Sequence, residues 1–98
     1  MKDFFVMVVL YAKEGREAEL RQSLTELVAL SRRDEGNLRY ELFTQQDNPS
    51  RFVFVEHWVS PEARDKHHTQ AVHIVNFHNG GVDAVERTEV AWFLDRLE

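Results

Sequence analysis

Imidazole side chains are the most conspicuous chemical groups in this sequence. The chain holds five histidines in 98 residues, and four of them (His67, His68, His73 and His78) fall within twelve positions. Imidazole titrates near neutral pH, so it is the side chain most often used as a general base, and it also binds metal ions. The cluster therefore raises two hypotheses, proton-transfer chemistry and a metal site.

The spacing of the histidines disfavours a metal site. His68 and His73 are five positions apart, which places them on different faces of one continuous helix, and no nearby acidic residue is spaced as a third ligand. A helix break near His68 and Thr69 would instead let both imidazoles point into one cavity between helix and sheet. We therefore expect no metal, take His68 and His73 as candidate general bases, and expect His67 and His78 to be solvated.

A carboxylate is expected to lie among aromatic rings on one face of a strand. Alternate residues of a strand face the same side, so Glu56 shares a face with Phe54 and Trp58. A buried glutamate is costly unless it is paired. Glu56 would either form a structural ion pair with Arg39 or Arg51, or orient a histidine or a substrate hydroxyl.

Composition excludes several classes of function. Without cysteine there is no thiolate nucleophile, disulfide or iron–sulfur site, and there is no glycine-rich phosphate loop, dinucleotide fingerprint or G-x-S-x-G motif. A flavin or nicotinamide enzyme would be hard to fit into this length, so we expect no cofactor. The formal net charge of −5 argues against a nucleic-acid partner.

A membrane location is also not expected. The longest apolar run, Phe4–Leu10, is far shorter than the about 20 residues that span a bilayer, and no small-residue cleavage site follows it. These features predict a small cytoplasmic domain with no membrane partner.

The elements that must position these groups follow from hydrophobic periodicity. The order is β-α-β-β-α-β, which predicts an α+β, ferredoxin-like antiparallel sheet with both helices on one face, as a single domain over residues 1–98. The expected strands are Phe4–Tyr11, Leu38–Thr44, Arg51–Val59 and Glu86–Leu97, and the expected helices are Glu14–Arg33 and Glu62–His78.

Turn and cap residues mark the ends of these elements. Gly36 is placed to stop the first helix, and Asn37 just beyond it is either a turn residue or an amide presented to a bound oxygen. The stretch 45–50 is rich in turn formers and predicts a hairpin. Ser60 is expected to cap the second helix, and Thr69 to cap its continuation after the break.

Both faces of the sheet are apolar. In the third strand Phe52, Phe54 and Trp58 lie on one face, whereas Val53 and Val55 lie on the other. Helices cover only one face, so the other needs a partner, and we expect a homodimer with the two sheets packed face to face. The alternative is an aggregation-prone monomer.

Four motifs together resemble the antibiotic biosynthesis monooxygenase superfamily, in particular its small quinol-monooxygenase-like and autoinducer-2-degrading branches. They are Asp34–Leu42 (DEGNLRYEL), Arg51-Phe52, Glu56-His57-Trp58 and His68-x4-His73, and the resemblance covers nearly the whole chain. It implies a dimeric α/β barrel with a pocket between sheet and helices in each subunit. By position it places in that pocket Asn37, Glu56, Trp58, His68 and His73.

Two details qualify the resemblance. Relatives often have proline before the second histidine, whereas this chain has Val72. A haem-degrading branch shares the fold but would want an asparagine in the first strand, and Phe4–Tyr11 has none. Haem degradation is therefore disfavoured.

The leading functional hypothesis from the resemblance is a cofactor-free monooxygenase that oxidises a quinol or polyphenol with O2. His68 or His73 would remove a phenolic proton, and the anion would pass an electron to O2 in a desolvated pocket. Glu56 or Asn37 would orient a substrate hydroxyl. The rings expected to stack on this small-molecule substrate are Trp58, Phe54 and Phe77.

Two other functions stay open. The first is an isomerase of a small phosphorylated hydroxy-ketone, in which the same histidine shuttles a proton between carbons and Arg39 or Arg51 binds the phosphate. The second is a non-catalytic dimeric module that binds a ligand in the same pocket, because one fold hosts unrelated functions.

Overall fold

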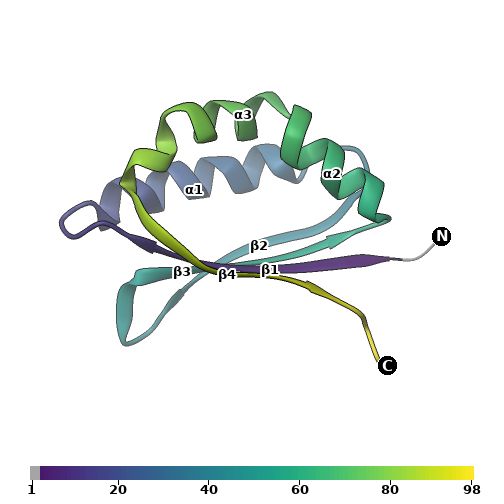
Figure 1. The fold of residues 1–98 in the computed structure, drawn as a ribbon, viewed down its shortest axis with the longest axis horizontal. Helices are drawn as coiled ribbons and strands as arrows, with labels where there is room; N and C mark the ends of the chain where they lie inside the picture. The colour runs from purple at the N-terminus through teal and green to yellow at the C-terminus, as the bar shows by residue number, and fades with distance from the viewer. Residues whose placement is uncertain (1–2) are drawn as a thin grey trace.

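Three helices lie on one face of a four-stranded antiparallel sheet (Figure 1). The computed structural model describes residues 3–98. The strand order is β2-β3-β1-β4, which confirms the predicted ferredoxin-like α+β fold. In chain order the elements are β1 (Phe4–Ala12), α1 (Glu17–Ser31), β2 (Asn37–Gln45), β3 (Asn48–Trp58), α2 (Pro61–Gln70), α3 (Val72–Asn79), the 3-10 turn η1 (Gly81–Ala84) and β4 (Val85–Leu94).

The core lies between the sheet and the helices. Phe52, Phe54 and Trp58 of β3 are buried there, as their alternation predicted. The stripe of α1 that packs on them consists of Leu20, Leu24, Leu27 and Val28. No helix within residues 3–98 is both long and apolar enough to cross a membrane.

Helix α1 is shorter at both ends than its periodicity predicted. It ends at Ser31 rather than Arg33, because the next amides bond three residues back: the N–H of Arg33 donates to the Leu30 carbonyl at 3.1 Å, and that of Asp34 to the Ser31 carbonyl at 3.0 Å. Gly36 therefore lies beyond the helix, at φ +84°, where it turns the chain into β2.

The hairpin between β2 and β3 is tighter than predicted. The strands reach Gln45 and Asn48, and Asn48 pairs with Gln45, so only Gln46 and Asp47 connect them instead of the whole stretch 45–50. At the other end of the sheet, β4 runs from Val85 to Leu94 and stops before the expected end at Leu97.

The second helical stretch breaks later than expected. The Ser60 hydroxyl caps α2 as predicted, accepting the Ala63 N–H at 3.1 Å. The break lies at Ala71 (φ −65°, ψ 126°), not at His68 and Thr69. Thr69 does not cap a helix, because its hydroxyl donates to the Asp65 carbonyl at 2.8 Å inside α2. His67 faces the core because Ser60 sets the start of α2 and His67 lies one turn after Ala63.

None of the helices within residues 3–98 covers the other face of the sheet (Figure 1). Met7 pairs with Val55 on one side and Trp92 on the other, so these side chains share that face. Among the large side chains there, Phe43 is 48% and Trp92 is 52% exposed. We call this surface the open face. The sequence predicted that it would be apolar, because the strands carry apolar residues on both sides.

Candidate functional site

A cavity of about 240 Å³ lies between the helices and the sheet. Its lining is largely apolar, with Leu24, Phe54 and Phe77 contributed by three different elements. A few polar groups converge on it, as is usual for small-molecule sites. They are Tyr40, Glu56, Arg64, His67, His68, His78 and Thr88.

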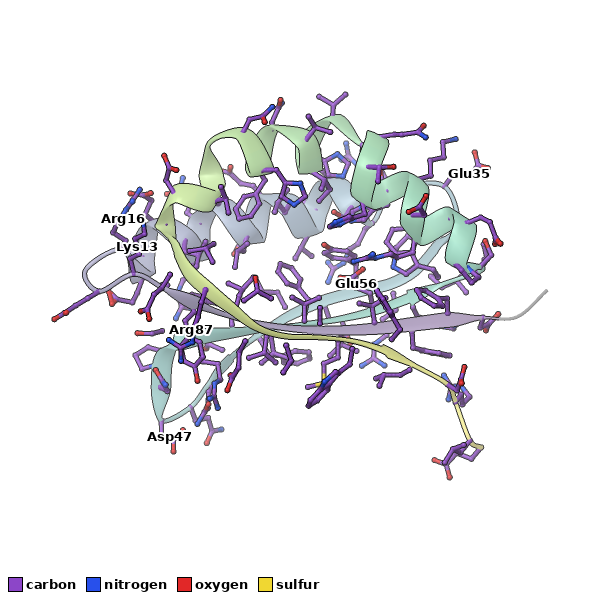
Figure 2. All side chains as sticks on the ribbon, viewed as in Figure 1. Lys13, Arg16, Glu35, Asp47, Glu56 and Arg87 are labelled. Atoms are coloured by element: carbon purple, nitrogen blue, oxygen red, sulfur yellow. The ribbon has the colours of Figure 1, made fainter. Side chains whose placement is uncertain are left out.

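The carboxylate of Glu56 lies in this interior. Figure 2 shows Glu56 projecting from the sheet toward the helices, and its side chain is buried. The indole N–H of Trp58 donates to its Oε1 at 2.9 Å. Burial raises the pKa of Glu56, against the opposing effects of the Trp58 hydrogen bond and the positive charge of Arg64.

A carboxylate from a different part of the chain joins two of the histidines. Oδ2 of Asp34, in the turn after α1, contacts Nδ1 of His67 in α2 and lies 3.1 Å from Nε2 of His73 in α3. His67 is 5% exposed, and its ring centroid lies 4.7 Å from that of Trp58 and 5.4 Å from that of Tyr40. The aromatic core and Asp34 together fix the orientation of this imidazole.

The turn that carries Asp34 is held against α2. The Val59 N–H donates to the Gly36 carbonyl at 2.9 Å, and the backbone of Gly36 lies so close to Ala63 that an added Cβ would stand 2.6 Å from the Ala63 Cβ. Ala63 and His67 are one helical turn apart on the same side of α2. The close approach at Gly36 thus brings Asp34 within reach of His67.

Burial of the His67 side chain favours its neutral form. Burial lowers the pKa of His67, and the hydrogen bond to Asp34 opposes this shift. With Nδ1 donating to Asp34, the lone pair resides on Nε2, which receives no hydrogen bond from any described residue. A neutral imidazole with a free Nε2 beside a largely apolar cavity can accept a proton from a ligand.

Asp34, His67 and His73 could also hold a metal ion. One candidate ligand atom from each side chain lies within 4.8 Å of the others, and a carboxylate with two imidazoles is a common donor set for transition metals. The sequence spacing disfavoured a metal because no acid near His68 and His73 was suitably placed. The fold supplies such an acid from 33 positions before His67.

Several predicted site residues are brought together at the cavity. Phe54, Glu56, His68 and Phe77 line it, and Trp58 is bonded to Glu56. His68 and His73 do not share one cavity as expected: His68 is exposed with its ring edge toward His78, whereas His73 lines a neighbouring hollow with Leu27 and Phe77.

Three predicted substrate-binding residues lie elsewhere. The side-chain amide of Asn37 donates to the Arg39 carbonyl at 3.2 Å, at the start of β2. Arg39 pairs with Glu41, and Arg51 lies 3.2 Å from a carboxylate oxygen of Glu89, so neither forms the ion pair with Glu56. Both arginines are on the open face, because they alternate with the cavity-facing residues of β2 and β3.

Sequence reasoning missed Asp34 and five polar residues that line the cavity, namely Tyr40, Arg64, His67, His78 and Thr88. The expectation that His67 is solvated is wrong, and that of an exposed His78 is confirmed. A usable signal was present: Ser60 fixes the start of α2, and His67 then falls one turn after Ala63 on the side that meets the core. No local pattern indicated Asp34.

Comparisons with known proteins identify the family of this chain. The family model described as "Antibiotic biosynthesis monooxygenase" matches residues 3–80. The chain is 35% identical over 75 residues to the Bacillus subtilis (strain 168) protein named "Putative monooxygenase YcnE", with 72% of this chain and 78% of that protein covered.

Solved structures share the whole fold. The crystal structure of PA3566 from Pseudomonas aeruginosa matches with a TM-score of 0.85 and 25% identity, covering 100% of this chain and 97% of that one. Rv0793 from Mycobacterium tuberculosis matches in fold with a TM-score of 0.88 at 21% identity, over 99% and 97% of the two chains. The family match covers most of the described residues, and the chain therefore belongs to the antibiotic biosynthesis monooxygenase family.

Proposed function

We propose that the protein is a cofactor-independent monooxygenase that oxidises a small electron-rich aromatic, a quinol or polyphenol, with O2. The observation that carries this proposal is the neutral, Asp34-bonded imidazole of His67 at a largely apolar cavity. His67 takes the role of general base that the sequence favoured for His68 or His73. Asp34 and His73 are positioning residues that act through His67.

The reaction starts with proton transfer. Nε2 of His67 accepts the phenolic proton, and the resulting phenolate passes one electron to O2. The radical pair combines to form a carbon–oxygen bond at a ring carbon. One oxygen atom stays there as a carbonyl, and the other leaves as water with the hydrogen of that carbon and the proton returned by His67. A phenol and O2 thus yield a quinone and water, with no external electron donor.

The walls of the cavity suit such a substrate. Phe54 and Phe77 offer rings to stack on an aromatic compound, and Trp58 backs the site from the core. The raised pKa of Glu56 favours its protonated form, which can donate a hydrogen bond to a substrate oxygen. The apolar lining keeps water from the phenolate and the radical pair.

Oxygen uptake by single-histidine variants tests the proposal. We expect uptake with a reactive quinol to fall by roughly a hundredfold or more in His67→Gln, because general-base catalysis is lost. His68→Gln should retain most activity, and His73→Gln should show an intermediate loss. If the His67→Gln variant consumes oxygen at the wild-type rate, or if the wild-type protein oxidises no quinol, the proposal fails.

The isomerase hypothesis is less well supported. Arg39 and Arg51, the residues expected to bind a phosphate, lie on the open face and not at the cavity. The Phe54 and Phe77 lining also suits a ring better than a phosphate. Proton exchange at a hydroxy-ketone carbon without oxygen would revive this alternative, and binding without turnover would favour a ligand-binding module.

We also propose that two copies pair through the open face. Support comes from the apolar side chains of Met7, Val53, Val55 and Val90 and the exposed rings of Phe43 and Trp92 on that face. Exposed apolar surfaces of this kind mark protein contacts, and identical open faces can pair about a two-fold axis.

A further inference from the structure

Arg64 lines the cavity, and its side chain forms no hydrogen bond or ion pair with the described residues. Its guanidinium lies over the ring of Phe93, with the Cζ atom 5.2 Å from the ring centroid. The Nε atom is buried and makes no hydrogen bond. No side chain among residues 3–98 forms an ion pair with this guanidinium, although most arginines of the chain that line other surfaces have a carboxylate or carbonyl partner.

The position of Arg64 is unfavourable for a cation in three respects. Its own N–H donates to the Ser60 carbonyl at 3.4 Å, so it stands at the N-terminal end of α2, where the helix dipole disfavours positive charge. The group is partly removed from water, and a buried donor is left unsatisfied. Where several local rules are broken together, the usual reason is function.

Glu56 attracts Arg64 electrostatically but does not bind its guanidinium. It is the one carboxylate among the described residues that line the cavity, but its Oε1 accepts the Trp58 N–H, and it forms no direct ion pair with Arg64. The other titratable groups at the cavity are Tyr40, His67, His68 and His78, none of which carries a negative charge at neutral pH. The cavity thus presents a guanidinium that no carboxylate of the described residues binds directly.

We propose that Arg64 binds an anionic oxygen of the cavity ligand, so that the ligand class is an aromatic compound carrying a phenolate or carboxylate. This inference rests on the proposed function, in which His67 generates a phenolate in the same cavity. The planar guanidinium donates charge-assisted hydrogen bonds to that oxygen while the ring lies among the apolar residues. Arg64 would therefore select the ligand and favour its ionised form.

A pair of matched probes tests this inference. 4-Nitrophenol ionises near neutrality and changes colour when it does, and 4-nitroanisole is its methyl ether, which cannot ionise. The nitro group makes both poor electron donors, so they report binding and not turnover. We would measure the affinity of each probe, and the pH at which bound nitrophenol ionises, for the wild type, Arg64→Met, Arg64→Lys and the control Arg21→Met, whose arginine is exposed on α1.

We expect the wild-type protein to bind the phenolate more tightly than the ether and to shift the ionisation of bound nitrophenol to lower pH. Arg64→Met should weaken phenolate binding roughly ten- to hundredfold and abolish that shift, because a charge-assisted hydrogen bond is lost. Its affinity for the ether should not change. Arg64→Lys should keep part of the preference, and Arg21→Met should behave as wild type.

Three results would overturn the inference: undiminished phenolate binding by Arg64→Met, equal loss of both probes, or binding of neither probe by the wild-type protein. The oxygen-uptake assay separates its failure from that of the proposed function. If the protein prefers the phenolate but consumes no oxygen, the proposed monooxygenase activity fails and Arg64 remains an anion-binding residue. If the protein consumes oxygen but does not prefer the phenolate, the monooxygenase proposal stands and the role of Arg64 fails.

Discussion

The indole N–H of Trp58 donates a 2.9 Å hydrogen bond to Oε1 of Glu56, and both side chains are buried. The two residues are two positions apart on β3, so the bond runs along one face of the strand toward the helices. It satisfies a buried donor and also anchors the carboxylate that lines the cavity. The ionisation of Glu56 should therefore affect both the stability of the protein and the chemistry of the cavity.

Glu56→Gln should change how stability depends on pH. Burial raises the folded-state pKa of Glu56 above its ordinary value of 4.5, so the folded state binds the proton more tightly than the unfolded state. The free energy of unfolding therefore decreases as the pH rises from 4.5 through the folded-state pKa of Glu56. Glutamine still accepts the Trp58 N–H but cannot ionise. We expect thermal melts to show that the melting temperature of the wild type falls relative to that of the variant as the pH rises above 4.5; a difference that instead widens on acidification would contradict this.

Asp34→Asn should lower turnover without removing the fold. Both histidines contact the same carboxylate oxygen, and a neutral amide oxygen in its place accepts hydrogen bonds more weakly, so the tautomer and orientation of His67 are held less firmly. We expect kcat to fall by roughly a hundredfold or more. Because Asp34 raises the pKa of His67, the acid limb of the residual pH–rate profile should move to lower pH. Asp65→Asn, an exposed change on α2, is the matched control and should leave both unchanged.

The strands and the cavity face of β3 could be predicted from the sequence, because strand alternation is local: Glu56 shares the side of Phe54 and Trp58 by spacing alone. The helix break could not be placed so well. Ala71 adopts an extended conformation that no glycine or proline marks, so no local signal places the break after His68 and Thr69. The contact of Asp34 with His67 spans 33 positions and depends on the packing of Gly36 against α2, which no local pattern encodes.

Gly36→Ala should destabilise the protein more than Gly15→Ala. Both glycines have positive φ, +84° and +82°, so alanine is strained at either position. An added Cβ at Gly36 would also stand 2.6 Å from the Ala63 Cβ and 2.9 Å from the Val59 Cγ2, whereas nothing lies within 4 Å at Gly15. We expect denaturant unfolding to show a loss of about 1 kcal/mol for Gly15→Ala and about 1–3 kcal/mol more for Gly36→Ala. Equal losses would show that the turn can move away from α2.

Removal of metal ions should leave the oxidation intact. In the proposed reaction the substrate supplies the electrons, and Asp34 serves as hydrogen-bond acceptor for His67 and His73. Treatment with a chelator followed by the oxygen-uptake assay should therefore give the untreated rate. If chelation abolishes uptake and one divalent metal restores it, the three side chains form a metal centre, and His67 is a ligand instead of a base.

Trp92→Glu should convert the proposed dimer to a monomer. Trp92 lies on the open face next to Met7, and a pairing of two open faces would bury its ring. A glutamate there would be removed from water without a partner in each copy, which is costly. Light scattering after size-exclusion chromatography should give the mass of two chains for the wild type and of one chain for the variant.

Val72→Glu is the control. It changes an apolar side chain on the helix side that is more exposed than Trp92, 72% against 52%. Because that side is not part of the pairing, Val72→Glu should stay dimeric, and a monomeric Val72→Glu with a dimeric Trp92→Glu would move the interface to the helices.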